Sequence, residues 1–211
     1  MSAILTFGDP SLSALVERGE TRRYRKGVIL INEGERSDAL FIIVAGKVKA
    51  FSVDDRDREI TYGVYGVGEV IGEMSLDGGP RSASVMTLEP TTCSVVTRGA
   101  LLAHIEANPS FALDLMARVI QRARIATRNA RNMALLDVYE RVVMLLESLA
   151  TVRDDGRRAI EERLTHAEIA SRVGCSREMV SRLMKDLRAG SYLLEEGKAW
   201  ILPAKPLPAR W

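Results

Sequence analysis

Between Pro109 and Gly156 the chain contains neither proline nor glycine. Over the first part of this stretch, apolar and small residues recur at alternating steps of three and four: Met116, Val119, Ala123, Ala126, Ala130 and Met133. This is the spacing of an a/d heptad seam, and it predicts one helix over residues 110–136, about 40 Å long. Such a helix could pack on the chain's own core. Because small seam residues favour close approach of a second helix, we expect a dimerisation helix instead.

The region before this helix has the pattern of an all-β domain. Six segments have strand length and either a continuous apolar run or alternating polar and apolar residues: 28–31, 39–44, 47–53, 59–65, 82–87 and 91–97. Many short strands separated by turns are typical of a closed or double-sheet antiparallel fold such as a jelly roll. We predict a β-roll domain over residues 1–109.

The long helix is expected to end at a hinge. Asp137 and Glu140 have the spacing of a capping box, in which a short acceptor at the N-cap is followed three residues later by a glutamate. A new helix is therefore predicted to begin at Asp137, and residues 135–137 form a break between two helices.

The C-terminal part has the form of a helix-turn-helix. Helices are expected over residues 165–173 and 176–189, and Gly174 supplies the positive φ of the turn between them. Four apolar residues of the second helix are expected to face the core: Val180, Leu183, Met184 and Leu187. A β-hairpin follows over residues 193–202, so residues 137–211 are predicted to be a winged helix-turn-helix domain of an α+β chain.

The outward face of the second helix carries the candidate DNA contacts. Arginine can make a bidentate bond to guanine N7 and O6, and glutamate can accept from cytosine N4. The predicted base-reading residues are Arg177, Glu178 and Arg182, with Ser181 on the same outward face. Phosphate contacts, which position a protein without reading sequence, are assigned to Thr165, Ser176 and Lys185. Thr165 and Ser176 are also the predicted N-caps. A solvated helix face is the alternative reading of these charges.

A glycine-rich segment inside the β region carries the candidate ligand site. Arg81 offers the planar fork that matches a phosphate, and Ser82 offers a hydroxyl. A short helical turn after Gly72 can offer backbone N–H groups, and Glu73 can accept from a ribose hydroxyl. The alternative is a surface loop with an incidental ion pair between Glu73 and Arg81.

Composition excludes several classes of protein. The two cysteines, Cys93 and Cys175, cannot form a disulfide scaffold, and the two histidines, His104 and His166, make a His-rich metalloenzyme improbable. No apolar run approaches the ~20 residues that span a bilayer, and no signal peptide is recognisable, so a cytoplasmic protein is expected. Residues 115–136 carry five arginines and no acidic residue, within a chain whose formal net charge is only +2.

The segments Gly72–Ala83 and Val173–Arg182, in this order, resemble the phosphate-binding cassette and the recognition element of the CRP/FNR family of transcription regulators. The resemblance covers about residues 8–202. It implies a non-enzymatic homodimer that binds a cyclic nucleotide, in the first place cAMP, and then an inverted DNA repeat with TGTGA-like half-sites. RNA polymerase is the further partner it implies. It also implies that Arg122 lies near the ligand and that Thr127 touches the purine, and it implies no metal and no catalytic residue.

Two departures from the family pattern leave the ligand open. Seven residues separate Glu73 from Arg81, fewer than in an enteric member of the family. Ala126-Thr127 stands where that member has two adjacent hydroxyl residues. An arginine-rich stretch could suit a cyclic dinucleotide, although a solvated helix face is its simpler reading: Arg118, Arg122, Arg124, Arg128 and Arg131. The alternatives are therefore a constitutive DNA binder and a cyclic di-GMP-responsive regulator.

Overall fold

The computed structural model describes residues 9–161 and 163–203 of the 211-residue chain. The chain forms two compact units, one made of Met1–Ser52 and Thr61–Ala126, the other of Val53–Ile60 and Thr127–Trp211. Among the described residues, no helix is both long and apolar enough to cross a bilayer.

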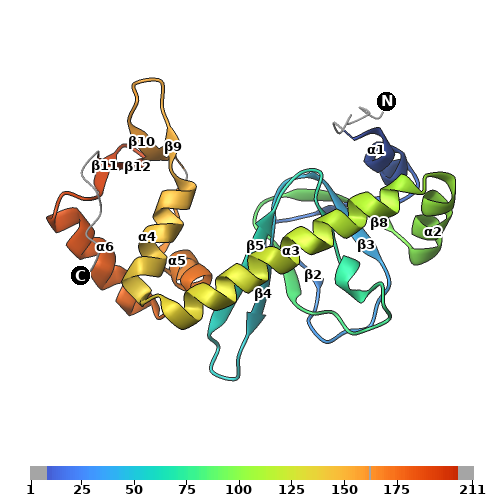
Figure 1. Cartoon of the computed structure of the whole chain (residues 1–211), viewed down its shortest axis with the longest axis horizontal. Helices are drawn as coiled ribbons and strands as arrows, with labels where there is room; N and C mark the ends of the chain where they lie inside the picture. Colours follow the sequence, from blue (N-terminus) through green and yellow to red (C-terminus); the bar gives the residue numbers. More distant parts are fainter. Residues whose placement is uncertain (1–8, 162, 204–211) are drawn as a thin grey trace. The chain divides into compact units, whose positions relative to one another are not determined.

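The first unit is built on two four-stranded sheets, with strand orders β1-β8-β3-β6 and β2-β7-β4-β5 (Figure 1). Their strands are β1 (Glu20–Tyr24), β2 (Ile29–Ile31), β3 (Leu40–Ala45), β4 (Val48–Val53), β5 (Glu59–Tyr65), β6 (Val70–Ile71), β7 (Ser84–Thr87) and β8 (Thr91–Val96). Pairing is antiparallel between β1 and β8, β8 and β3, β3 and β6, β2 and β7, and β7 and β4. Because most neighbours are not consecutive in the chain, this is the predicted double-sheet β-roll.

Strand β3 explains why the core of this unit has two halves. Leu40 and Ile42 belong to one cluster of buried side chains, whereas Ile43 belongs to the other. Successive side chains of a strand point to opposite faces, so a strand buried on both faces must be a continuous apolar run. The apolar run predicted as a strand at residues 39–44 therefore lies between the two halves of the core.

Two elements precede the first predicted strand. Helix α1 (Pro10–Glu17) is capped by Asp9, whose carboxylate accepts from the backbone N–H groups of Ser11 and Leu12. Strand β1 is an edge strand whose five residues are exposed or half-buried, so it lacks the apolar alternation that reveals a strand in a sequence. A further small correction concerns β7, which begins at Ser84 rather than at residue 82.

His104 joins the helices that follow the β-roll. It lies in α2 (Arg98–Ala107) and is fully buried. Its Nε2 lies 3.0 Å from Ser11 Oγ of α1, and its ring packs edge-on against Phe111 with a centroid distance of 4.8 Å. Burial, together with the charge of Arg18, lowers the pKa of this imidazole against the opposing effect of Asp9. His104 therefore has a structural role.

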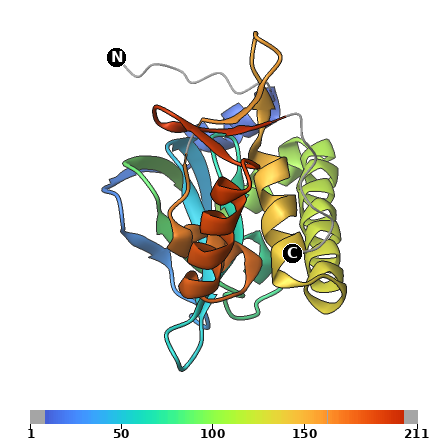
Figure 2. The same ribbon diagram turned by 90° about the vertical axis from the view of Figure 1, so that its left-hand side faces the viewer.

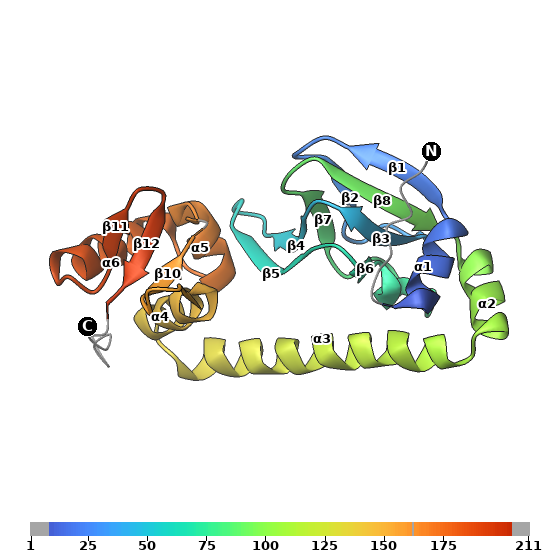
Figure 3. The ribbon, with the colours of Figure 1, turned by 90° about the horizontal axis from the view of Figure 1, so that it is seen from above.

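Helix α3 (Ser110–Leu135) is continuous, as predicted (Figure 3). Only Phe111 and Leu115 of its residues are buried. Phe111 and Leu115 belong to the core of the first unit, whereas the seam residues from Met116 to Met133 are exposed or half-buried. Packing on the chain's own core is thus found only for the start of the helix, and dimerisation stays a prediction. Asp137 caps the next helix in a full capping box with Glu140, and the break between the two helices lies at the predicted place.

The second unit has three helices after α3 and a four-stranded sheet of order β11-β12-β10-β9 (Figure 2). These elements are α4 (Val138–Leu149), β9 (Thr151–Val152), β10 (Arg158–Ile160), α5 (His166–Val173), α6 (Arg177–Ala189), β11 (Leu194–Glu196) and β12 (Ala199–Leu202). The hairpin β11–β12 is the predicted wing, and its sheet is extended by β9 and β10, two strands that were not predicted. One apolar cluster, which includes Val142, Ile169, Leu187 and Trp200, holds this unit together.

Candidate functional site

The candidate ligand segment folds around Gly72. Its φ of +93° is in the left-handed region, and a Cβ on this residue would lie 2.5 Å from Arg81 Nη1 and 3.0 Å from the carbonyl oxygen of Ala39. A single 3₁₀ turn, η1 (Glu73–Ser75), follows directly. Glycine is thus required both for the backbone conformation and for the close approach of the arginine.

Arg81 is buried, with 4% of its surface exposed. Its Nη1 donates to the carbonyl oxygen of Gly72 at 2.8 Å and to Ser75 Oγ at 2.7 Å, and its Nη2 donates to the carbonyl oxygen of Ala39 at 2.6 Å. Burial lowers the pKa of this guanidinium, while more distant carboxylates oppose the shift. The alternative reading, an incidental ion pair between Glu73 and Arg81, is not found: the hydrogen bonds of the guanidinium go to neutral oxygens.

Glu73 pairs instead with Arg122 of α3. Arg122 also donates to the carbonyl oxygen of Val70 at 2.6 Å, lies 3.3 Å from Glu69, and stacks over the ring of Tyr65 at 4.6 Å. Burial alone would lower the pKa of Arg122, but the hydrogen bond and charge of Glu73 raise it above its usual value. The structure therefore brings Arg122 to the cassette, as the resemblance implied.

Two contacts of Arg122 were missed in the sequence. Tyr65 ends strand β5 and Glu69 precedes β6, and neither belongs to a recognisable motif. A second arginine of α3, Arg118, donates to the carbonyl oxygen of Gly68 at 3.1 Å. Helix α3 is thus tied to the backbone around β6 by two arginines four residues apart, the spacing of one helix face.

The remaining candidate ligand residues are more loosely placed. Ser82 is exposed, and its hydroxyl donates to Met74 Sδ at 3.4 Å. Thr127 is exposed on α3, five residues after Arg122. Its contact with a purine stays a prediction.

The helix-turn-helix forms from local signals that the sequence shows. Thr165 and Glu168 make a full capping box at the start of α5, and Gly174 adopts φ +69° at the turn. Ser176 Oγ accepts from the backbone N–H of Met179 at the start of α6. The predicted core residues of α6 are all buried: Val180, Leu183, Met184 and Leu187.

The outward face of α6 has the predicted composition. Arg177, Arg182 and Lys185 are exposed, and within the described residues their side chains make no hydrogen bond. Glu178 is exposed too, and hydrogen bonds at the helix start, from its own backbone and from Ser176, lower its pKa. The hydroxyls of Thr165 and Ser176 accept N–H groups as caps. The O–H of Thr165 is left able to donate to a phosphate, whereas that of Ser176 is shared with the carboxylate of Glu178.

Residues 21–108 match the cyclic nucleotide-binding domain, and residues 140–204 match the Crp-like helix-turn-helix domain. The chain is 31% identical over 203 residues to the cAMP-activated global transcriptional regulator CRP of Haemophilus influenzae, with 92% of this chain and 88% of that protein covered. The chain belongs to the CRP/FNR family of transcription regulators.

Other members of the CRP/FNR family are similar over the same length. The CRP-like cAMP-activated global transcriptional regulator of Mycobacterium tuberculosis is 30% identical over 199 residues, covering 92% of this chain and 89% of that protein. Among solved structures, the c-di-GMP responsive global regulator CLP of Xanthomonas campestris matches with a TM-score of 0.79 and 26% identity, over 92% of this chain and 99% of that chain. The chain is therefore a CRP-like, cyclic-nucleotide-binding transcription regulator.

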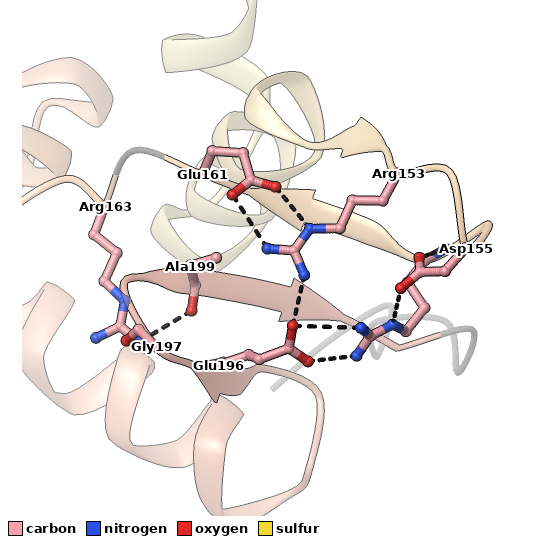
Figure 4. A network of polar contacts seen from close by, with 8 residues as sticks. Arg153, Asp155, Glu161, Arg163, Glu196, Gly197 and Ala199 are labelled. Atoms are coloured by element: carbon pink, nitrogen blue, oxygen red, sulfur yellow. Dashed lines mark hydrogen bonds and ion pairs between the residues drawn. The ribbon is translucent and has the colours of Figure 1, made fainter.

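The wing of this CRP/FNR regulator is held by an ion-pair network that the sequence did not reveal (Figure 4). Glu196 lies 2.7 Å from Arg153 and 2.5 Å from Arg157, both of which belong to the β9–β10 hairpin. The two arginines also pair with Glu161 and Asp155. Hydrogen bonds from Arg157 and Arg153 lower the pKa of Glu196. Glu196 lies 43 positions from Arg153 and 39 from Arg157, too far apart in the chain for a local pattern to indicate these two pairs.

A second branch of the network reaches the recognition helix. Glu195 of the wing lies 3.2 Å from Arg188 of α6 and 3.5 Å from Arg163. Arg163 also donates to the carbonyl oxygens of Gly197 and Ala199 (Figure 4). The end of α6 and the wing are thereby tied together, and the acidic wing tip is paired with basic groups.

Ser181 is placed differently from the other candidates on α6. It is half-buried, and its Oγ lies 2.8 Å from Nδ1 of His166, the first residue of α5. The hydroxyl therefore already has one partner within the protein.

Proposed function

We propose that this regulator is a homodimer that binds cAMP at the cassette and, when it is occupied, an inverted DNA repeat with TGTGA-like half-sites. The observation that carries the ligand part is the environment of Arg81. A buried cation that contacts only neutral oxygens lacks the paired charge that normally accompanies burial. A cyclic phosphate supplies that charge.

The bonds of Arg81 also leave room for the phosphate. A guanidinium has five N–H donors, and three of those of Arg81 are used within the described residues. The Nε–H and one hydrogen on Nη2 remain for an anion. Because the other three are bonded to fixed backbone and hydroxyl oxygens, the fork is oriented before the ligand arrives, which reduces the entropy cost of binding.

Glu73 connects ligand binding to α3. Arg122 occupies Oε1 of its carboxylate and leaves Oε2 to accept from a ribose hydroxyl. A ligand that bonds to Glu73 therefore acts on the same carboxylate that holds α3 through Arg122. We infer that ligand binding shifts the population of α3 arrangements through this pair, as an allosteric ligand must by binding one state more tightly.

The homodimer part rests on the exposed apolar face of α3. Leu113, Met116, Ile120 and Met133 are all large apolar side chains, between 47% and 65% exposed. Leu113, Met116 and Ile120 follow each other at steps of three and four, and Met133 ends the predicted a/d seam, on a helix that buries little against its own chain. Contiguous exposed apolar surface marks an interaction site, and a second copy of α3 fits it.

The names of the relatives favour cAMP over a cyclic dinucleotide. Curated relatives at 29–31% identity are described as cAMP-activated, whereas a solved relative at 26% identity is described as responsive to c-di-GMP. The cassette offers one buried arginine, which suits one phosphodiester. The exposed arginines of α3 keep cyclic di-GMP, with its two phosphodiesters, as the second candidate ligand.

Fluorescence anisotropy of a labelled TGTGA-N6-TCACA duplex tests the proposal, at fixed salt because phosphate contacts make affinity salt-dependent. We expect cAMP to tighten binding at least tenfold, and the Arg81→Ala variant to lose this response while Arg98→Ala, an exposed arginine of α2, keeps it. A response to cyclic di-GMP alone would select the second ligand. Equal binding of this duplex and a random duplex under all conditions would contradict the half-site assignment.

RNA polymerase is the proposed further partner of the DNA-bound dimer. A regulator bound near a promoter acts by recruiting or excluding polymerase, and in vitro transcription from a promoter that carries the duplex sequence distinguishes the two. A cAMP-dependent change in transcript level in either direction is the expected result.

A further inference from the structure

We propose that His166 is a positioning residue for Ser181, and that protonation of its ring fixes the Ser181 hydroxyl as a hydrogen-bond donor toward DNA. The proposal rests on the DNA-reading role of α6 set out above. It adds a proton-sensitive residue, outside the recognition helix, to the recognition surface.

The geometry gives His166 this position. It is the first residue of α5, and its Nδ1 lies 2.8 Å from Oγ of Ser181, the fifth residue of α6. This bond connects the two helices of the motif, which also pack together through apolar side chains. Ser181 lies four residues from Arg177 and four from Lys185, so it shares their side of the helix. The Ser181 hydroxyl is thus bonded to the imidazole ring, on a side of the helix that also carries the exposed basic residues.

The chemistry of the bond depends on the charge of the ring. A neutral imidazole has two tautomers, and the one with its proton on Nε2 accepts the hydroxyl proton of Ser181 at Nδ1. The imidazolium has hydrogens on both nitrogens, so Nδ1 can only donate to Ser181. The hydroxyl proton must then turn away from the ring. It can donate to guanine N7 or O6, to thymine O4, or to a phosphate oxygen.

The charges around His166 determine how DNA affects its protonation. Burial lowers the pKa of His166, and the positive charges of Arg188 and Arg177 on α6 lower it further. On its own helix, Glu168 is bonded to the backbone N–H of Thr165. Glu195 of the wing lies beside Arg188 and Arg163 rather than beside the ring.

DNA changes this balance in one direction. Phosphates that approach α6 bring negative charge to the two arginines that oppose protonation of His166. DNA binding should therefore raise the pKa of His166 and take up a proton, and by linkage a lower pH should tighten binding. If DNA binding raises the pKa of His166 by one unit, the affinity for DNA at a pH well below this pKa is about tenfold higher than at a pH well above it.

The experiment uses the full chain with cAMP and the duplex at constant ionic strength, from pH 5.5 to pH 8.5. We expect wild-type affinity to rise by up to about tenfold as the pH falls, and we expect His166→Gln and the double variant to share one flat profile. Ser181→Ala should keep only the smaller part of the pH dependence that the DNA phosphates impose on the ring directly. The chain has only two histidines, so His166→Gln assigns the NMR signal of His166. Its titration is expected to move to higher pH when the duplex is added. Ser148→Ala, an exposed serine of α4, is the matched control.

Two results would overturn the inference. One is a wild-type pH profile in His166→Gln, and the other is an unchanged profile in Ser181→Ala, because the effect would then bypass the hydroxyl. Failure of the proposed function looks different, since no duplex is then preferred at any pH. An NMR signal of His166 that does not shift when the duplex is added is a third result that contradicts the inference.

Discussion

Two arginines of the same unit show how partners decide what a side chain does. Arg81 is buried against neutral oxygens and keeps donors for an anion, whereas Arg122 is paired with Glu73 and joins α3 to the cassette. Both are charged at every pH of interest. The first is suited to bind a ligand, and the second is suited to transmit its effect.

Replacing Arg81 by lysine tests whether the fork matters beyond its charge. Lysine keeps the positive charge but lacks the planar donor set, so the phosphate loses a bidentate partner. Hydrogen bonds to charged groups contribute about 1.5–3 kcal/mol, and we expect Arg81→Lys to weaken cAMP binding by roughly tenfold to a hundredfold. Calorimetric titration measures the affinity, with Arg98→Lys as the surface control. Wild-type affinity in Arg81→Lys would show that charge alone suffices.

His104 predicts a dependence of stability on pH. Burial and Arg18 lower its pKa in the folded chain, while the unfolded chain takes up a proton near pH 6.5. Its contribution to the free energy of unfolding is therefore complete above pH 6.5 and is lost as the pH falls toward the lowered folded-state pKa.

Urea denaturation at pH 7.5 and pH 5.5 measures this loss. We expect the wild type to lose more unfolding free energy between these values than His104→Gln, which cannot titrate. Parallel losses in the two proteins would mean that other groups account for the acid sensitivity.

At the scale of elements, the caps decide where helices begin. Asp137 accepts from the backbone N–H of Glu140 at 2.8 Å, and Glu140 accepts from the backbone N–H of Asp137 at 2.8 Å. We expect Asp137→Ala to lower the free energy of unfolding by about 1 kcal/mol, because an N–H at the start of α4 loses its acceptor. Asp137→Asn, which keeps an oxygen acceptor, should lose much less in urea denaturation. An equal loss in both variants would assign the effect to charge rather than to capping.

Elements with local signals could be predicted from the sequence, and elements without them could not. The caps at Asp137, Thr165 and Ser176 depend on residues within three positions of each other, so a single stretch of sequence shows them. Strand β1 was not predicted because an edge strand with polar residues shows no alternation of polar and apolar side chains. The pairing of Arg153 with Glu196 was not predicted because the two residues are 43 positions apart in the chain.

The candidate site likewise has residues that local motifs indicate and contacts that no local motif indicates. Glu73, Arg81 and the exposed residues of α6 were predicted because they lie in compact motifs. The neutral partners of Arg81 were not predicted, since every residue has a backbone oxygen and the sequence does not indicate that the one of Ala39 is an acceptor. The bond between His166 and Ser181 was missed because it joins two elements whose bonded residues are 15 positions apart in the chain.

For the whole molecule, DNA affinity should depend on the association of two chains. Substitution of Ile120 by aspartate places a charge on the exposed apolar face of α3, where it would be desolvated in a dimer. We expect Ile120→Asp to be a monomer in analytical ultracentrifugation. It should bind the palindromic duplex about a hundredfold more weakly, since the second half-site no longer adds to the first.

The matched control for the dimer is Gln121→Glu, an added charge at an exposed position of the same helix that lies three or four residues from none of these apolar side chains: Leu113, Met116, Ile120 and Met133. It should remain dimeric and bind DNA as the wild type does. A dimeric Ile120→Asp variant would remove α3 as the dimer interface, while a monomeric variant with full affinity would show that one chain suffices for binding.

The preference of the arginines for backbone oxygens has a consequence for how this protein tolerates substitution. Arg118, Arg122 and Arg81 donate to the carbonyl oxygens of Gly68, Val70, Gly72 and Ala39, which every amino acid provides. In a scan of all single substitutions, the arginines should therefore be intolerant while acceptors such as Val70 and Ala39 accept other side chains of similar size. The wing should show the opposite pattern, with Glu196 and its arginines changing together in evolution. Sequence drift can thus alter the wing by paired exchanges, whereas the bonds from α3 to backbone oxygens depend on the arginine donors alone.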